Sequence, residues 1–249
     1  MTINSELKGR QLLLYTKKLH EIIDACVWES ENYVLEPFRF YDTIIYKISS
    51  LLDTAGLLIF NIDNKPHYID TLYLSLRTCM LDNICLLHVF DVHEDLDEAK
   101  NRVLKIMSDH VKAFYKSANT KEERADVRMR LPEFFNGDSL IDNKSITANY
   151  MKNKIQNYPS LKREADHSFY LYTIFSKIEH NGFFTRDMLH GHHLDEGRQK
   201  AKELIIEAVG NSIVIVNTIL LVWIKDTDPK YVSLFNLAKD FLYVNDLRI

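Results

Sequence analysis

The sequence predicts an all-α fold, a bundle of long antiparallel helices with a short helical or loop insertion at about residues 119–160. Apolar residues recur close to the helical period of 3.6 over most of the chain. Seven glycines and five prolines in 249 residues are too few for a loop-rich all-β fold. The chain is long enough to bury one substantial core, so we expect a single helical domain over residues 1–249.

The expected helices follow from the apolar period and from the breaks between periodic segments. In the first one, Leu12, Leu19 and Ile23 mark the apolar face. A polar turn closed by Pro66 separates the second helix from the strongly apolar third. Acidic residues from Asp95 onward open the fourth, where they complement the helix dipole. The expected ranges are 5–28, 40–60, 67–90, 94–118, 147–157, 161–181, 195–225 and 229–244.

Two segments differ from this pattern. Residues 119–160 contain a charge run from Lys121 to Arg130 and the turn 136–139, and their end is mildly basic. They are interpreted either as a solvated insertion packed over the bundle or as a basic cover over a site. The segment from His167 to His193 holds five of the ten histidines, and its second half is expected to be a glycine-punctuated connection between helices.

Composition limits the class of protein. The net charge of -4 gives no global reason for binding nucleic acid, although a local basic face is compatible with it. Cys26, Cys79 and Cys85 lie in apolar helical patterns without a CxxC pair, which is typical of a reducing cytoplasm. Polar residues interrupt the apolar run 204–224, so we expect a buried core helix there and no membrane association. The chain is therefore expected to be cytoplasmic.

The third helix carries two charges, Arg77 and Asp82, inside an apolar run. A lone buried ion is costly, so each of them needs a partner. Five residues apart, they are offset by about 140° on the helix and need not pair with each other. Arg77 is either a structural residue tied to a carboxylate of a neighbouring helix or a fork that holds a phosphate or carboxylate at a polar site.

Ser176 and His180 are four residues apart and share one helix face, and Tyr172 extends this face by one turn. One interpretation is a polar seam through the core. The other makes His180 a general acid or base, which Ser176 or a partner on the third helix orients.

A metal site is a further alternative. Glu164 and His167 have the Glu-x-x-His spacing of di-iron helical bundles, and Asp187 and His190 are a distant analogue. Asp187 together with the cluster His190, His192 and His193 could also chelate one divalent ion. The remaining interpretation of this cluster is a solvent-exposed polar turn.

Two helical patches carry a family resemblance. They read Leu74-Ser-Leu-Arg-Thr-Cys-Met-Leu-Asp-Asn-Ile84 and Tyr172-Thr-Ile-Phe-Ser-Lys-Ile-Glu-His180. The first resembles the "Arg-Ser/Thr … acidic-Asn" core helix of the HEPN superfamily and of related helical families in bacterial defence and toxin loci. The second is similar to their "Tyr … Ser … His" helix. Together the patches cover about twenty residues.

The resemblance implies a ribonuclease chemistry. Active HEPN nucleases carry an arginine, four to six residues, and then a histidine, with the arginine on the phosphate and the histidine helping to activate the ribose 2′-hydroxyl. Arg186 and His192 have five residues between them, although Gly191 directly precedes His192. Arg77 with His180 is an alternative pair, built across two helices.

Three hypotheses follow. The first is a metal-independent HEPN-like endoribonuclease of a bacterial toxin or phage-defence system, without a cofactor, that binds RNA in the cleft of a homodimer. Its candidate catalytic residues are Arg77, Ser176, His180, Arg186 and His192. The second is a non-catalytic helical binding or regulatory module. The third is a metal-binding helical-bundle enzyme.

Overall fold

The fold is all-α, as the sequence predicts. The computed structural model describes the backbone of residues 3–28, 36–141, 146–190 and 195–225, and the side chains of 3–24, 37, 39–141, 146–177 and 196–220. The helices within these ranges are α1 (Ser5–Trp28), α2 (Glu36–Asn61), α3 (Tyr68–Phe90), α4 (Leu96–Ser117), α5 (Lys121–Arg130), α6 (Ala148–Lys154), α7 (Pro159–His190) and α8 (Asp195–Lys225). The strands are β1 (Phe135–Asn136) and β2 (Ser139–Leu140).

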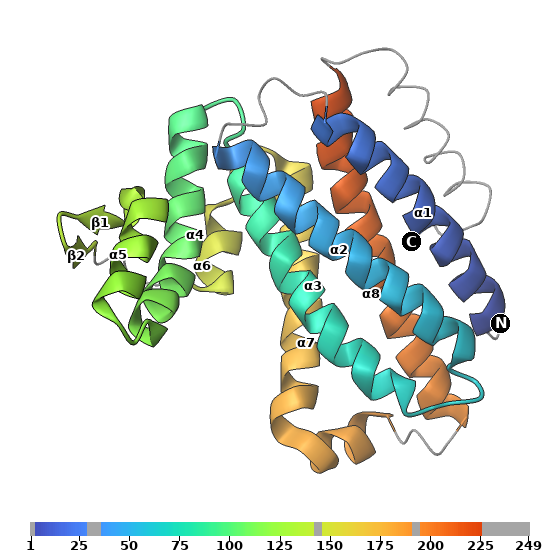
Figure 1. Cartoon of the computed structure of the whole chain (residues 1–249). Helices are drawn as coiled ribbons and strands as arrows, with labels where there is room; N and C mark the ends of the chain where they lie inside the picture. Colours follow the sequence, from blue (N-terminus) through green and yellow to red (C-terminus); the bar gives the residue numbers. More distant parts are fainter. Residues whose placement is uncertain (1–2, 29–35, 142–145, 191–194, 226–249) are drawn as a thin grey trace.

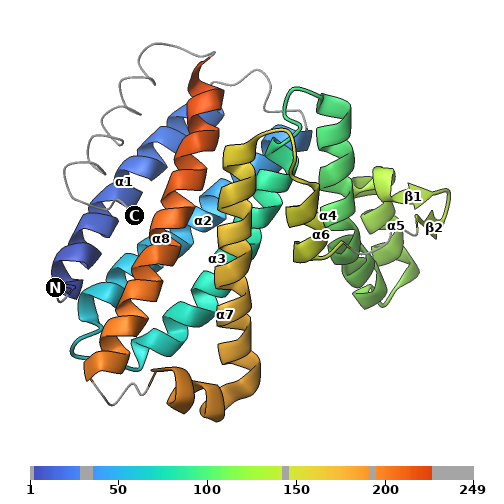
Figure 2. The same ribbon diagram turned by 180° about the vertical axis from the view of Figure 1, so that it is seen from behind.

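Helix α3 lies at the centre of the bundle. It packs against α2, α4, α6, α7 and α8. Figure 1 shows α1, α2, α3 and α8 side by side, and the view from behind in Figure 2 shows α7 passing over α3 between α8 and α6. Helices α4 and α5 and the small hairpin extend to one side of the bundle (Figure 1).

The second half of α3 is buried on every side. Each residue from Asp82 to Asp91, which caps the helix, is buried. A helix that is covered all round has no solvated face, so its polar side chains must be satisfied by neighbouring helices. The largest fully buried side chains around this core are Tyr15, Tyr73, Phe175, Leu12, Leu19, Ile22, Ile23, Ile45, Ile48, Leu52 and Ile62.

Helices α1 and α2 approach each other closely at two glycines. A Cβ atom on Gly9 would lie 2.6 Å from the backbone nitrogen of Phe60 and 2.7 Å from the carbonyl oxygen of Gly56. A Cβ atom on Gly56 would meet the side chain of Leu13 at 3.0 Å and the carbonyl oxygen of Gly9 at 3.3 Å. The backbones therefore touch at Gly9, where no side chain fits, whereas the flexible Leu13 side chain can move away from position 56.

The segment 119–160 contains more regular structure than its composition predicts. The charge run forms α5, whose N-terminus has a capping box: Thr120 Oγ1 accepts from the Glu123 backbone N–H at 3.1 Å, and the Glu123 carboxylate accepts from the Thr120 N–H at 3.2 Å. Strands β1 and β2 pair antiparallel across a turn where Gly137 has a φ of 59°. Local capping and a turn glycine thus order a segment with little apolar surface.

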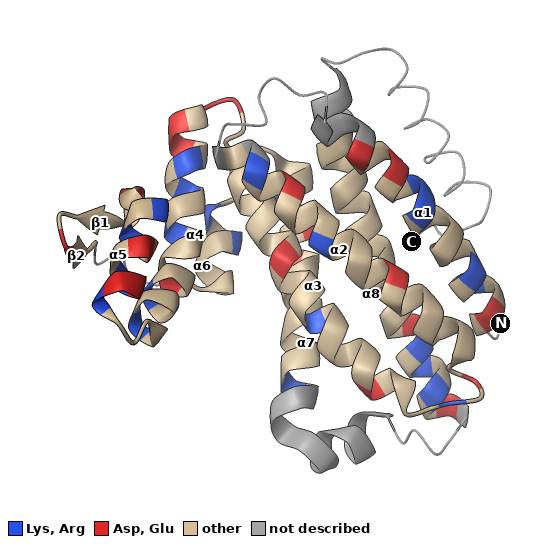
Figure 3. Cartoon of the chain, viewed as in Figure 1, with Lys and Arg blue, Asp and Glu red and all other residues tan. Residues whose placement is uncertain are grey.

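This segment divides between two places in the fold. The hairpin packs against α4, where the rings of Tyr115 and Phe135 meet edge to face at 5.1 Å. Helix α6 packs against α3 and α7. Basic and acidic residues are interspersed over α4 and α5 in the view of Figure 3. The insertion therefore packs on the bundle through α6, and the part beyond α4 projects away from it.

Helix α7 is longer than expected. The sequence predicts a helix end near residue 181, but the helical backbone continues to His190. The expected connection is therefore shorter and begins after His190. The physical reason is that one glycine, at position 182, costs a helix only about 1 kcal/mol, and residues 160–194 contain no proline that would stop it.

Among the residues that the structure describes, two stretches are long and apolar enough to cross a membrane by length and composition alone, Arg39–Asn61 and Glu196–Leu220. The same length and composition are also found in core helices that pack on their neighbours. In this bundle α2 packs against α1 and α3, and α8 packs against α3 and α7.

We predict that Gly9→Ala destabilises the protein by about 1–3 kcal/mol, because the new methyl group must displace the α2 backbone. Gly56→Ala is the matched control at the same contact. We expect it to cost less than Gly9→Ala, since the Leu13 side chain can yield, the Gly9 carbonyl oxygen lies farther away at 3.3 Å, and alanine gains about 1 kcal/mol in helix propensity. Urea unfolding measures both, and equal losses would contradict the close backbone approach at Gly9.

Candidate functional site

Arg77 and Ser176 meet across the contact between α3 and α7. The Nε of Arg77 donates a hydrogen bond to the Ser176 Oγ at 3.1 Å. Both side chains are partly exposed. The sequence left open whether Arg77 ties to a carboxylate or lies at a polar site, and its contacts on α7 include this hydroxyl.

Tyr172 lies one turn before Ser176 on the same face of α7. The guanidinium carbon of Arg77 is 5.7 Å from the centre of its ring, within the range of a cation–π contact. A hydroxyl and an aromatic ring thus hold the planar guanidinium from two sides. Such an anchored fork suits recognition of a phosphate or carboxylate.

The aromatic pair Tyr73 and Phe175 explains why Arg77 and Ser176 meet. Both side chains are buried, and their ring centres are 5.3 Å apart. Tyr73 lies four residues before Arg77 on α3, and Phe175 directly precedes Ser176 on α7. The apolar pair fixes the register of the two helices, and this register brings the arginine and the serine together at the edge of the interface.

The remaining candidate catalytic residues lie outside the part of the chain whose side chains are described. This applies to His180 and Arg186, whose backbone belongs to α7, and to His192. The helical repeat places the Cα of residue 180 one turn beyond Ser176 on α7. The structure therefore brings together Arg77 and Ser176, and the position of residue 180 follows from the helix alone.

Asp82, the other charge of α3, has its own partner. Its carboxylate oxygens lie 2.8 and 3.0 Å from Lys47 Nζ of α2. Arg77 and Asp82 thus turn to different neighbouring helices, as their spacing on α3 predicts. Burial raises the pKa of Asp82, and Lys47 opposes this shift.

Polar side chains of α8 also face α3 and α7 inside the core. Asn83 Nδ2 donates to Ser212 Oγ at 3.0 Å, and Asn211 Nδ2 donates to Ser168 Oγ at 2.7 Å. Sequence reasoning treats Asn211 and Ser212 only as interruptions of an apolar run. Their spacing to the polar positions of α3 and α7 has no sequence signal, because it depends on how the helices pack.

A second buried polar cluster joins α3, α4 and the chain after α6, and sequence reasoning missed it. Asp91 Oδ1 accepts from the backbone N–H groups of Gln156 and Asn157 at 3.2 and 2.9 Å. Arg102 Nη1 lies 3.4 Å from the other Asp91 oxygen and donates to the His88 carbonyl at 2.6 Å. An aspartate directly after a long apolar run was the available signal. The satisfied, enclosed geometry indicates a structural role.

His88 in this cluster is held neutral. Burial lowers its pKa from 6.5 to about 3, and the nearby Arg102 guanidinium contributes to the shift. A neutral imidazole can accept the donors around it without placing a second positive charge beside Arg102.

The described members of the possible metal site have other partners. Glu164 pairs with Arg163 at 2.8 Å, and His167 Nε2 lies 3.2 Å from Glu207 of α8. Within the residues that the structure describes, no group of three or more His, Cys, Asp or Glu side chains could hold a metal ion. Asp187, His190 and the cluster up to His193 lie outside the described side chains.

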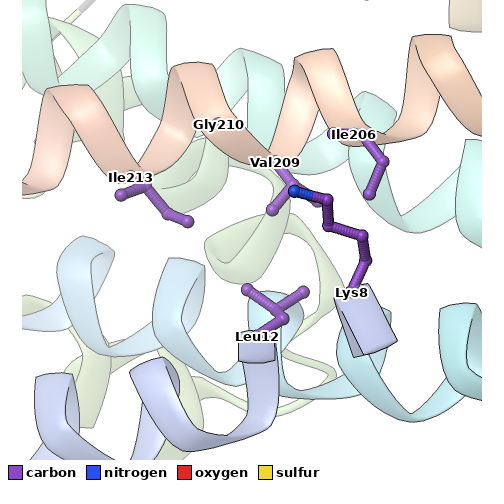
Figure 4. Close-up of a pocket in the computed structure, with 6 residues that line it drawn as sticks. All are labelled: Lys8, Leu12, Ile206, Val209, Gly210 and Ile213. Carbon is purple, nitrogen blue, oxygen red and sulfur yellow. The ribbon is translucent and has the colours of Figure 1, made fainter. Parts of the chain in front are cut away.

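A small apolar pocket lies apart from these polar groups, between α1 and α8. Its walls are Lys8, Leu12, Ile206, Val209, Gly210 and Ile213 (Figure 4). Lys8 reaches across the pocket from α1 toward α8 (Figure 4). Because the walls are apolar and no polar groups converge on it, this pocket is better explained by helix packing than as a catalytic site. The contact between Arg77 of α3 and Ser176 of α7 remains the better candidate site.

Comparison with known proteins adds no relative. No protein-family model, no curated protein and no solved structure matches this chain.

We predict that His88 weakens the fold in mild acid. Its folded-state pKa lies below the unfolded value, so protonation favours unfolding. The contribution of neutral His88 is complete above pH 6.5 and declines as the pH falls toward 3, by about 3 kcal/mol at pH 4. Urea unfolding between pH 7 and pH 4 measures this loss.

The matching variant is His88→Gln, which cannot titrate. We expect its unfolding free energy to depend less steeply on pH between pH 7 and pH 4 than that of the wild type. Identical slopes in the two proteins would contradict the buried neutral imidazole.

We also predict that Cys79 and Cys85 do not react with thiol reagents in the folded protein. Both are buried, and burial raises the pKa of each thiol to about 12, so the reactive thiolate is scarce. A Cys26→Ser background removes the third thiol from a colorimetric thiol assay at pH 8. Labelling should begin only on addition of denaturant, and rapid labelling without denaturant would contradict the burial.

Proposed function

We propose that this chain is a metal-independent endoribonuclease of HEPN-like type, in which Arg77 holds the scissile phosphate and His180 transfers protons. The observation that carries the proposal is the anchored guanidinium of Arg77, with its Nε 3.1 Å from Ser176 Oγ and its carbon over the Tyr172 ring. An arginine fixed in this way loses little conformational entropy when it binds a phosphate.

The placement on α7 supports the pairing with His180. Residue 180 follows Ser176 by one turn of the same helix, and we propose that its imidazole is the general acid or base that acts on the phosphate bound by Arg77. Cleavage then needs no metal. The histidine takes the proton of the ribose 2′-hydroxyl, whose oxygen attacks the phosphorus while the bond to the 5′-oxygen of the next nucleotide breaks. The products are a 2′,3′-cyclic phosphate and a 5′-hydroxyl, whose proton comes from water or from the protonated histidine. The arginine stabilises the charge on the phosphate oxygens.

The whole protein in this proposal is a cytoplasmic homodimer of a bacterial toxin or phage-defence system that acts on RNA. Because the net charge is -4, affinity for RNA must come from a local group of side chains and not from the overall field.

A second candidate is a non-catalytic helical binding or regulatory module. The observation that favours it is that polar residues of α3 are already engaged within the bundle, Asp82 with Lys47 and Asn83 with Ser212. In this case the Arg77–Ser176 contact is one more tie between helices. Activity measurements separate the two candidates.

We predict that the purified full chain cleaves single-stranded RNA in EDTA. Arg77→Ala and His180→Ala should each lower the cleavage rate by about a hundredfold or more, because each removes a group that acts in the transition state. Arg77→Lys should also lose activity, since a lysine keeps the charge but not the planar fork. Gel analysis of a labelled RNA measures the rates.

The controls are Arg10→Ala on α1 and His110→Ala on α4, both at exposed positions, and neither should change the rate. If Arg186→Ala and His192→Ala abolish cleavage while the Arg77 variants retain it, the assignment to Arg77 is wrong. A chain that cleaves no RNA in EDTA favours the non-catalytic module.

A further inference from the structure

Four partly exposed side chains form a row beside α7, which we call the α7 row: Lys152, Phe169, Tyr172 and Arg77. Lys152 Nζ of α6 lies 4.7 Å from the centre of the Phe169 ring. The rings of Phe169 and Tyr172 are 6.4 Å apart and tilted by 33°. Arg77 of α3 then lies over Tyr172 at 5.7 Å. Two aromatic rings are thus flanked by a cation at each end.

Three helices contribute to the row, and their packing sets its direction. Helix α6 packs against α7 near the start of α7, and α3 packs along it (Figure 2). Phe169 and Tyr172 are three residues apart, so the two rings advance about 4.5 Å along α7. Ser176, which Arg77 contacts, lies one turn beyond Tyr172.

The side chains of the row are partly exposed. Lys152, Phe169, Tyr172 and Arg77 each keep some solvent contact, although Phe169 and Tyr172 also pack against the core. Leu171 and Phe175 of α7 are buried. Lys162 and Asp166 beside the row form an ion pair, and Lys152 is 3.5 Å from the same Asp166. Among these side chains, two lysines and Arg77 stand against one carboxylate on a chain that is slightly acidic overall.

We propose that the α7 row binds single-stranded RNA, with bases stacked at Phe169 and Tyr172 and with phosphates at Lys152 and Arg77. This inference rests on the proposed function for the identity of its ligand, and adds how the strand reaches the site. Aromatic faces beside a basic track are how proteins bind single strands, because each base offers a π face. A duplex keeps its bases stacked inside and cannot present them to the two rings.

The row also explains how a chain with a net charge of -4 could bind a polyanion. Stacking contributes about 1–3 kcal/mol per base and does not depend on the overall charge. Only two cations of the row contact phosphates, so the salt dependence should be shallow, with a log–log slope of about −1.4. A slope several times steeper would indicate a different, larger basic surface.

Fluorescence anisotropy of the full chain with a labelled ten-nucleotide strand in EDTA tests the proposal. A strand with 2′-deoxyribose sugars keeps its bases and phosphates but lacks the nucleophile, so binding is measured without cleavage. Phe169→Leu, which keeps apolar volume and loses the ring, should weaken binding about five- to hundredfold. Lys152→Gln should weaken it less and reduce the salt slope by about 0.7.

The matched controls are Tyr150→Leu and Lys154→Gln, because this ring and cation on α6 form a similar pair at 5.8 Å outside the row. Neither control should change the affinity. Phe169→Trp keeps an aromatic face and should retain binding, which separates loss of stacking from loss of folding. The corresponding duplex should bind far more weakly than the single strand.

The outcomes distinguish this inference from the proposed function. If the wild-type chain binds no single strand, or if Phe169→Leu binds as well as wild type or Tyr150→Leu loses as much, the α7 row is not the binding track. If cleavage depends on Arg77 while Phe169→Leu leaves affinity and KM unchanged, the proposed nuclease function is supported and RNA binding by the α7 row is wrong. If the chain cleaves no RNA but binds single strands through Phe169, binding by the α7 row is supported and the proposed nuclease function is wrong.

Discussion

The burial of α3 on all sides is the constraint on which the rest of the structure depends. Ten consecutive residues from Asp82 to Asp91 have no solvated face, so their polar side chains depend on partners from other elements. Lys47 reaches Asp82 from α2, Ser212 reaches Asn83 from α8, and backbone N–H groups after α6 reach Asp91. These contacts specify how the helices around α3 are placed, beyond what apolar packing alone would specify.

The first half of α3 is under a weaker constraint, and the candidate site lies there. Leu74 is 51% exposed and Arg77 is partly exposed, so this part of the helix borders solvent. A charge at such an edge keeps access to water, and its cost of burial is lower than that of Asp82. The same helix thus carries structural charges where it is enclosed and a reachable arginine where it emerges.

Arg77 belongs to both proposals. It is the last member of the α7 row proposed to bind RNA, and it is one of the residues proposed to catalyse cleavage. Its neighbours Tyr172 and Ser176 belong to one helix face, and their positions depend on the buried pair Tyr73 and Phe175 beneath them. The buried contact between Tyr73 and Phe175 therefore positions Arg77, although it takes no part in the proposed binding. Loss of this contact would shift the site even though no polar residue had changed.

The sequence by itself determined the all-α class, the limits of α1 and α8, and the shared face of Tyr172 and Ser176, because helical periodicity and polar breaks are local properties of the chain. It missed α5 and placed the end of α7 too early, since capping and one tolerated glycine outweighed the charge pattern and the expected break. Only the tertiary structure decided that Arg77 meets Ser176, that Asp82 pairs with Lys47, and that Asp91, Arg102 and His88 form a cluster. The physical reason is that these contacts join side chains of different helices, and helix packing rather than any local pattern sets their distances.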